Sequence, residues 1–263
     1  MTQLFTFPAQ PARAAWPLVV VGSREITPRL RRVSLIGECL EGFVHRPGQS
    51  LVLSLPQPGG ALARRHYTIR DFDREELRLD IDLVAHGQTP GVRWAQSARI
   101  GDPILAEGPR GHIGVRHRAD WHLFAGDETA LPAIAAMIES LPAGARAYVV
   151  IEVSGPDEED QLDTAAELEA LWVHRRGPPA AESAALVEPI RSFQFPDGVG
   201  QAYLMGETHT VRAQRHALIA RGLPKEQILA EGYWRPGRIG GHDHVEDIGD
   251  RVPRGRMRRR PWA

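Results

Sequence analysis

The segment from residue 64 to residue 70, RRHYTIR, concentrates side chains that could bind a planar, phosphate-bearing cofactor. The ring of Tyr67 can shield a flavin, and the hydroxyl of Thr68 can form a hydrogen bond with the edge of its ring system. Arg65 can form charge-assisted hydrogen bonds with a phosphate. The alternative is an exposed, arginine-rich strand that places one tyrosine in the core. On its own, this segment does not decide between the two.

A glycine-containing turn leads into a short helix that the pattern predicts over residues 92–98. The turn reads DLVAHG over residues 82–87, and PGVRWA follows over residues 90–95. Because the first backbone N–H groups of a helix have no partner within the helix, such a turn suits a phosphate group. An ordinary Gly/Pro turn followed by a core tryptophan has the same pattern, so both interpretations stay open.

A third motif, GDETALP at residues 126–132, follows an apolar run and opens a predicted helix. Nucleotide-binding α/β sheets hold their ligands at the carboxyl ends of strands, which is where this motif falls. It differs from G-x-G-x-x-G, so the usual dinucleotide fingerprint is absent. Asp127 and Thr129 could equally serve as helix caps. A similar run, GET at residues 206–208, follows a later strand and would border the same crevice.

The first half of the chain has the pattern of short β-strands. Apolar and charged residues alternate from Leu77 to Leu83, which is the period of a half-buried strand. Gly/Pro turns separate this run from similar short strands predicted at residues 33–36, 51–55 and 104–106. Many short strands at this spacing predict a small antiparallel barrel.

From residue 121 the pattern changes to strands that alternate with helices, which predicts a parallel sheet with helices on its faces. The fold class is therefore an N-terminal antiparallel β-barrel followed by a parallel-sheet α/β domain, joined near residues 115–120. Acidic residues 157–163 are expected to form a loop and the start of a helix. The predicted strands lie at residues 121–125, 146–153, 171–174 and 201–205, and the helices at residues 131–141, 181–193 and 210–221.

The composition limits the function classes. Lys and Arg number 32 against 33 Asp and Glu, so no net field directs this protein toward nucleic acid. Cys39 is the only cysteine, which excludes an internal disulfide and a Cys-ligated iron–sulfur cluster. Electrons would therefore be carried by an organic cofactor, and we expect no bound metal. No apolar stretch approaches the ~20 residues of a membrane span. We expect a cytoplasmic protein without a signal peptide or membrane insertion.

Taken together and in this order, the motifs resemble those of the siderophore-interacting protein family. These are the flavin-dependent ferric-siderophore reductases of the ferredoxin-reductase-like superfamily. The resemblance covers about residues 16–238 and includes RHYT at residues 65–68, which is similar to the family's R-x-Y-T flavin motif. GDETALP and the later GYWR, at residues 232–235, are its more specific parts.

The resemblance implies three segments: an FAD-binding barrel at residues 16–118, an NAD(P)H-binding α/β domain at residues 119–236 and a Gly/Arg-rich tail at residues 237–263. It also implies a set of FAD-binding residues that spans all three motifs, with Glu128 beside them where the domains meet. The set comprises Arg65, His66, Tyr67, Thr68, Val84, His86, Gly87, Val92, Trp94, Ala95, Asp127, Thr129 and Ala130.

The electron donor and the substrate would occupy two further groups of residues. For the NAD(P)H crevice we expect Glu207 and Arg212, with a 2′-phosphate on Arg175 or Arg176, because paired arginines suit this dianion. An anionic ferric chelate beside the flavin would be attracted by Arg64, Arg235 and Arg238.

The expected function is that of an oxidoreductase. Electrons would pass from NAD(P)H, or from ferredoxin, through FAD to siderophore-bound Fe³⁺, which releases Fe²⁺ for iron utilisation. Two alternatives stay open at this point. One is a flavin reductase of the same superfamily that serves another acceptor, and the other is a flavin- or siderophore-binding protein without turnover.

Overall fold

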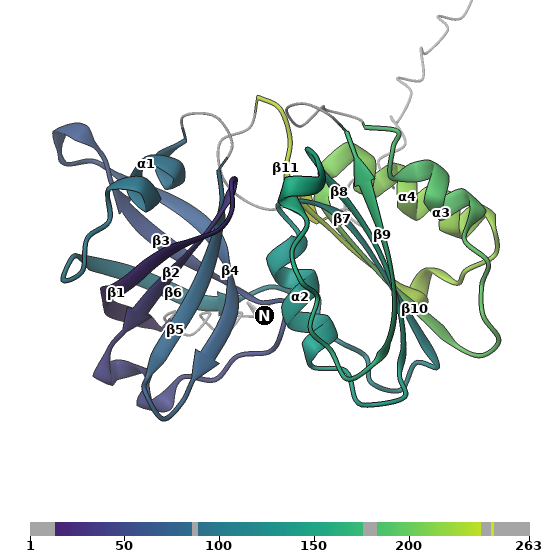
Figure 1. Cartoon of the computed structure of the whole chain (residues 1–263), viewed down its shortest axis with the longest axis horizontal. Coiled ribbons are helices and arrows are strands. Elements are labelled where there is room, and N and C mark those ends of the chain that lie inside the picture. The colour runs from purple at the N-terminus through teal and green to yellow at the C-terminus, as the bar shows by residue number, and fades with distance from the viewer. Residues whose placement is uncertain (1–13, 86–88, 176–182, 238–242, 245–263) are drawn as a thin grey trace, which may run out of the picture.

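Two structural units lie side by side, a barrel built by the first half of the chain and an α/β layer built by the second (Figure 1). The computed structural model describes residues 14–85, 89–175, 183–237 and 243–244. The units are the antiparallel barrel and the parallel sheet that the sequence pattern predicts, so the predicted fold class is confirmed.

Six antiparallel strands close the barrel in the order β1-β2-β5-β4-β3-β6. Its core comes from inward-facing apolar residues such as Leu79 and Ile81, which alternate with charged residues along β5. Leu77, predicted as a strand residue, has a φ of 49° and belongs to the turn before β5. The strands are β1 (Ala15–Thr27), β2 (Leu30–Ile36), β3 (Ser50–Pro56), β4 (Leu62–Asp73), β5 (Arg78–Val84) and β6 (Pro103–Arg110).

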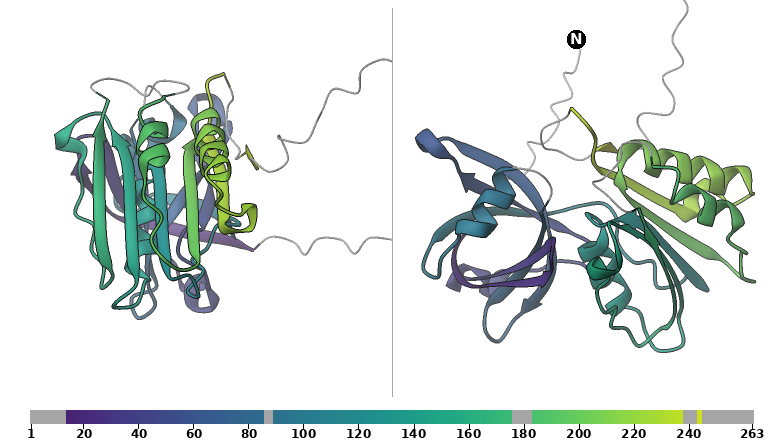
Figure 2. Two further views of the ribbon diagram at one scale, coloured as in Figure 1. Left: turned by 90° about the vertical axis from the view of Figure 1, so that its right-hand side faces the viewer. Right: turned by 45° about the horizontal axis from the view of Figure 1, so that its top comes forward.

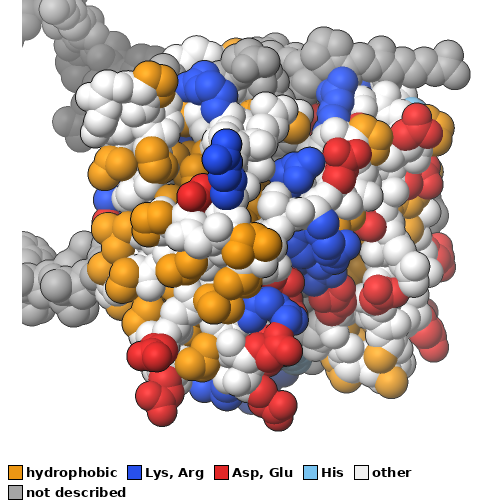
Figure 3. Space-filling view, turned by 60° about the vertical axis from the view of Figure 1, so that its left-hand side comes forward, with side chains coloured by type: hydrophobic (Ala, Val, Ile, Leu, Met, Phe, Trp, Pro, Cys, Tyr) orange, Lys and Arg blue, Asp and Glu red, His pale blue; other side chains and the backbone are white. Residues whose placement is uncertain are grey.

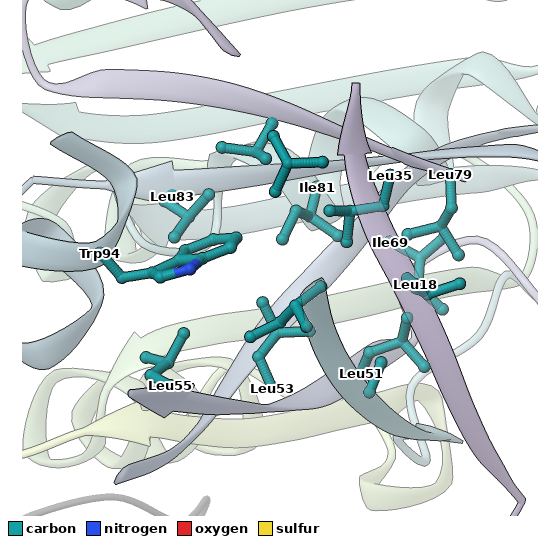
Figure 4. Close-up of a cluster of buried hydrophobic side chains, with 14 of the residues drawn as sticks. Leu18, Leu35, Leu51, Leu53, Leu55, Ile69, Leu79, Ile81, Leu83 and Trp94 are labelled. Carbon is teal, nitrogen blue, oxygen red and sulfur yellow. The ribbon is translucent and has the colours of Figure 1, made fainter. Parts of the chain in front are cut away.

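The sequence pattern did not predict strand β1. Its thirteen residues include the apolar run at residues 16–21, where Leu18 and Val20 are buried in the barrel core. Figure 4 shows Leu18 among leucines and isoleucines of the neighbouring strands, with Trp94 inserted at one end of the cluster. A run of consecutive apolar residues hides the strand period, because alternation is visible only where the outer face is polar.

Helix α1 (Pro90–Ser97) packs on one end of the barrel. Its start is defined by Pro90 in the first turn and by Thr89, whose Oγ1 accepts a hydrogen bond from the Val92 N–H (3.3 Å). Trp94 and Ala95 face the barrel core, so the helix is anchored by its apolar side. It begins two residues before the predicted position.

The second unit is a sheet in the order β12-β11-β10-β7-β8-β9, parallel except for β12. Helix α2 covers the sheet face toward the barrel, and α3 and α4 cover the other face (Figure 1 and Figure 2). The helix predicted at residues 181–193 spans only Val187–Ser192 in the structure, and residues 181 and 182 lie outside the described part. The elements are β7 (Trp121–Asp127), α2 (Leu131–Glu139), β8 (Arg146–Val153), β9 (Glu167–His174), α3 (Val187–Ser192), β10 (Gly200–Glu207), α4 (Thr208–Ala220), β11 (Ile228–Trp234) and β12 (Asp243–His244).

Ion pairs and hydrogen bonds join the two units. Arg70 on β4 donates to Glu139 at the end of α2, with an Nη1–Oε2 distance of 2.6 Å. Glu158 accepts from the Thr27 hydroxyl (2.6 Å) and from the Arg29 backbone N–H (3.1 Å). The acidic segment around Glu158 was expected to be a loop and the start of a helix. The loop is confirmed at residues 159–164, but the next element is strand β9 rather than a helix. Glu158 itself is 9% exposed and lies in the domain interface, because the β1–β2 turn supplies its donors.

The surface on the barrel side carries hydrophobic side chains among charges of both signs (Figure 3). Exposed Val19 on β1 pairs with Ile36 on β2, so these two apolar side chains are neighbours. Positive and negative side chains lie next to one another on this face, in agreement with the balanced composition. In the described part of the chain, no helix is both long enough and apolar enough to cross a bilayer.

Candidate functional site

Strand β4 presents the RHYT motif with alternating direction, so Arg65 and Tyr67 share one side of the strand and His66 and Thr68 share the other. Tyr67 packs against the barrel core, and burial raises the pKa of its hydroxyl to about 12. The positive charge of Arg65, on the same side of the strand, opposes this shift. Tyr67 is therefore a neutral hydrogen-bond donor at physiological pH.

Gly91 in the first turn of α1 is in close contact with Tyr67. A Cβ atom at Gly91 would lie 1.6 Å from the Tyr67 hydroxyl oxygen and 2.8 Å from the ring carbon that carries it. Only a glycine leaves room for the phenol here, so the strand motif and the start of the helix form one cradle. The exposed fractions of Val92, Trp94 and Ala95 are 5–6%. Trp94 and Ala95 pack into the barrel core, and Val92 and Ala95 line a neighbouring cavity.

A cavity of about 70 Å³ lies between the β1–β2 turn, the end of β5 and α1. Three residues of the predicted FAD set, Val84, Val92 and Ala95, line it. The β1–β2 turn also contributes through residues 27–31, to which the sequence analysis gave no binding role. The family resemblance extends over this turn, and that was the signal that could have found it. His86 and Gly87 lie outside the described residues.

Neighbouring arginines of β4 have different partners. Arg64 binds Glu107 in a bidentate ion pair, with an Nη2–Oε2 distance of 2.7 Å. The Arg65 guanidinium donates instead to the Arg64 carbonyl (2.8 Å). Among the residues that the structure describes, no carboxylate lies within ion-pair distance of Arg65. Arg65 therefore carries the unneutralised charge of this segment. Of the other arginines expected at the substrate, Arg235 is half-buried just after β11, and Arg238 lies outside the described residues.

In the second unit, Asp127 at the end of β7 connects three strands. Its Oδ2 accepts from the Trp234 indole (2.9 Å) and from the Glu207 N–H (2.8 Å), and its Oδ1 accepts from the Thr129 N–H (2.9 Å). Burial raises the pKa of Asp127 to about 6, against the opposing effect of these hydrogen bonds. Ala130 is fully buried, and its N–H donates to the Asp127 carbonyl, so the structure places it in the core.

A small hollow of about 10 Å³, enough for about one water molecule, lies at the carboxyl ends of β7, β8 and β10. Arg175, which follows β9, lines it but is held by Glu128 (2.5 and 2.8 Å) and by Glu152 (3.1 Å). Although burial alone would lower the pKa of Arg175, these two carboxylates raise it overall. The 2′-phosphate ligand predicted for Arg175 thus faces a guanidinium that is already neutralised. Arg176 lies outside the described residues.

Glu207 lines the same hollow and caps α4. It accepts hydrogen bonds from the N–H groups of His209 and Thr210, both at 2.9 Å. Burial acts to raise the pKa of Glu207, but these hydrogen bonds lower it overall, so the carboxylate stays ionised. Arg212, predicted beside it, lies further along α4 and outside the set of lining residues. Sequence reasoning missed Glu152 and Ser183, for which no motif gave a signal.

Comparisons with known proteins agree with this geometry. The family model described as siderophore-interacting protein matches residues 119–237, and the siderophore-interacting FAD-binding domain matches residues 57–113. Ferric vibriobactin reductase ViuB of Vibrio cholerae is 32% identical over 241 residues, which cover 83% of this chain and 88% of that protein. The chain belongs to the siderophore-interacting protein family.

Solved structures of this family have the same fold. A siderophore utilization protein from T. fusca superposes with a TM-score of 0.81 at 33% identity, covering 88% of this chain and 96% of that one. The siderophore-interacting protein SipS from Aeromonas hydrophila gives 0.74 at 31% identity, over 87% and 94% of the two chains. The FAD-binding match includes β4 and α1, so the cradle around Tyr67 and Gly91 belongs to the family's FAD-binding domain.

Proposed function

We propose that this protein is an FAD-dependent reductase of ferric siderophores that takes its electrons from a nicotinamide nucleotide. The observation that carries the proposal is the cradle in which the Tyr67 hydroxyl occupies the space that a Gly91 side chain would fill. It joins an aromatic ring, an unneutralised arginine and the start of a helix, the three parts that a flavin with a pyrophosphate requires. Relatives named ferric vibriobactin reductase and ferric acinetobactin reductase support the substrate class.

The residues of the cradle could bind FAD without first breaking an ion pair. Arg65, which lacks a carboxylate partner among the described residues, would hold a phosphate. The backbone N–H groups in the first turn of α1 would face the pyrophosphate, as helix N-termini do for anions. Tyr67 would lie against the flavin ring, and its neutral hydroxyl would donate a hydrogen bond rather than repel phosphate.

The reaction balances as one nicotinamide nucleotide oxidised for two Fe³⁺ ions reduced, with release of one proton. Bound FAD supplies the change from hydride transfer to single-electron transfer that an Fe³⁺/Fe²⁺ couple needs. The protein itself positions the reactants, and no side chain has to act as a general acid or base. Fe²⁺ binds hard oxygen ligands less tightly than Fe³⁺, so reduction loosens the metal from the chelate.

The ferric chelate would approach the flavin from the side of Arg235. Arg64, expected to share this role, is neutralised by Glu107, which leaves it less positive potential to offer an anion. Its part in substrate binding stays a prediction, as does that of Arg238. The supply of reduced nicotinamide nucleotide is intracellular, which is the basis for proposing a cytoplasmic site of action.

An anaerobic visible spectrum tests the proposal in three steps. The purified protein is expected to show flavin absorbance, to lose it on addition of NADH or NADPH, and to regain it on addition of a ferric siderophore. A colourless protein that neither reduced nucleotide changes would overturn the proposal in favour of a non-flavin binding protein. A flavin that is bleached but that no ferric chelate reoxidises would assign the protein to another electron acceptor.

A further inference from the structure

Arg70, the last residue of the RRHYTIR segment, lies in a β-bulge, and its side chain reaches the second unit. On β4, Ile69 and Asp71 pair with two consecutive residues of β5, so Arg70 is the extra residue between them. β-Bulges redirect side chains and are over-represented next to active sites. This bulge lies two residues after Thr68. The strand with the predicted flavin motif therefore also supplies a contact to the other unit.

Arg70 is the centre of a charge network that crosses from the barrel to α2. Its two Nη atoms donate to the two carboxylate oxygens of Glu139, with an Nη1–Oε2 distance of 2.6 Å. Its Nε lies 3.9 Å from Asp82, to which Arg32 donates at 2.7 and 2.9 Å. The exposed fractions of the Arg70 and Asp82 side chains are 11% and 1%. The network is thus largely screened from water, where a bidentate pair has a well-defined geometry.

Helix α2 connects this network to the edge of the sheet at which open α/β sheets bind nucleotides. Glu139 is its last residue, and the GDETALP motif at the carboxyl end of β7 forms its start. The helix spans nine residues, about 13 Å at 1.5 Å per residue, and lies between β4 and the sheet (Figure 1). A carboxylate at a helix C-terminus faces the negative end of the helix dipole, which the positive charge of Arg70 offsets. The pair therefore holds one end of a stiff element whose other end lies at the nucleotide edge.

The other contacts between the units leave their orientation less well defined. Leu30 of the barrel packs in the core cluster of the second unit, and Gly48 lies against Met137, 2.9 Å from its Sδ if a Cβ were present. Apolar contacts of this kind are non-directional, so they resist separation more than they resist sliding. The hydrogen bonds of Glu158 to the β1–β2 turn form another polar contact. Without Arg70, the units could rotate about that contact.

We infer that Arg70 is a positioning residue, which holds the nucleotide edge of the second unit in alignment with the flavin strand of the barrel. The inference rests on the proposed function, because it requires hydride transfer from a nicotinamide nucleotide to FAD. In this transfer two electrons and one proton leave the nucleotide together, so the nucleotide is oxidised and FAD is reduced. Such a step depends steeply on alignment, and a misplacement of about 1 Å can cost about a hundredfold in rate.

Stopped-flow measurements of flavin reduction by NADH and by NADPH test the inference on the FAD-loaded protein. Arg70→Met removes the guanidinium but keeps an unbranched side chain, and Asp82 keeps its ion pair with Arg32. The limiting rate at saturating nucleotide should fall about tenfold or more, because misalignment slows transfer rather than binding. The half-saturating concentration and the FAD dissociation constant should change by less than about twofold. An unchanged limiting rate, or a loss of binding alone, would overturn the inference.

Two further variants separate positioning from a general loss of structure. Glu139→Gln weakens the same pair from its more exposed side, and its limiting rate should fall as in Arg70→Met. Because both substitutions act on one pair, the double variant should be no slower than the slower single variant. Arg191→Met removes an exposed pair with Glu188 on α3, which covers the opposite face of the sheet, and should keep the parent rate. Additive losses in the double variant, or an equal loss in Arg191→Met, would contradict the role of the pair.

A distance measurement supplies a readout that does not depend on turnover. Cys39 is the only cysteine and is exposed on the barrel, and Leu171→Cys, at an exposed position of β9, adds a second attachment site. Pulsed electron spin resonance between spin labels at these sites should give a broader distance distribution in Arg70→Met and Glu139→Gln than in the parent. Equal widths would overturn the inference while the proposed function stands. If neither nucleotide reduces the parent protein, the proposed electron donor is wrong, and the inference fails with it.

Discussion

The barrel and the α/β unit each place an arginine in the site predicted for a nucleotide, but in opposite electrostatic settings. Arg65 lies on the same side of β4 as the neutral Tyr67, and its guanidinium donates a hydrogen bond to a backbone carbonyl. Arg175 is almost fully buried between Glu128 and Glu152. The first arginine can therefore bind an anion, whereas the second already forms part of the structure.

The difference shows that a motif identifies the residue type but not the net charge around it. Both arginines belong to Arg-Arg or Arg-His runs, and both follow or form a β-strand. What separates them is the sheet topology, in which β8 lies between β7 and β9, so that Glu152 on β8 and Glu128 just after β7 both reach Arg175. An arginine's availability to ligands is thus decided by residues far away in the sequence.

The largest expected effect comes from the substitution of Arg175. Arg175→Ala leaves Glu128 and Glu152 buried without a counter-ion, and we expect the free energy of unfolding to fall by about 3–5 kcal/mol. Arg191→Ala is the matched control, because Arg191 forms a surface ion pair with Glu188 in which both side chains are more than half exposed, and its loss should cost less than about 1 kcal/mol. Urea unfolding measures both. Similar small losses in the two variants would mean that Arg175 is not structural.

The contact between the strand motif and α1 gives the next largest effect. Gly91→Ala introduces a methyl group into the space of the Tyr67 hydroxyl, and this overpacking should cost about 1–3 kcal/mol and reduce the FAD content. Gly114→Ala serves as the control, since a Cβ there meets no atom within 4 Å. Thermal unfolding and flavin absorbance per chain measure the outcome. Full flavin content in Gly91→Ala would show that the cradle is elsewhere.

The free energy of unfolding should depend on pH, because burial raises the pKa of Asp127 to about 6. The folded state therefore binds a proton more tightly than the unfolded state, and this contribution to stability grows as the pH falls through 6. Between pH 7 and pH 5 the free energy of unfolding should gain about 1.3 kcal/mol from this group. Asp127→Asn removes the contribution, so the difference between the two proteins should change with pH. A constant difference would contradict a raised pKa.

The fold was largely predictable because its cues are local. The alternation along β5 and the apolar strand before GDETALP both gave elements close to those observed. Strand β1 escaped because Trp16–Val21 is apolar on both faces, and Leu77 was misplaced because its turn conformation has no glycine to signal it. Neither feature has a local cue in the sequence.

The site was predictable only in part, for a related reason. Tyr67 and Gly91 belong to recognisable motifs, yet nothing in the sequence shows that their atoms are in contact. Glu152 and Glu158 fall in no motif, although the first lines a hollow and the second joins the two units. Pairings across the sheet and across the domain interface are properties of the fold, so a linear pattern cannot display them.

The most direct measurement of the central claim compares two adjacent arginines. FAD is titrated into flavin-free Arg65→Ala and Arg64→Ala, and its dissociation constant is read from flavin fluorescence. Because Arg65 would supply a charge-assisted hydrogen bond to phosphate, its loss should weaken FAD binding by about tenfold or more. Arg64 is neutralised by Glu107, and its loss should leave the dissociation constant unchanged. Equal weakening in both variants, or none in Arg65→Ala, would contradict the assignment of Arg65 to the flavin phosphate.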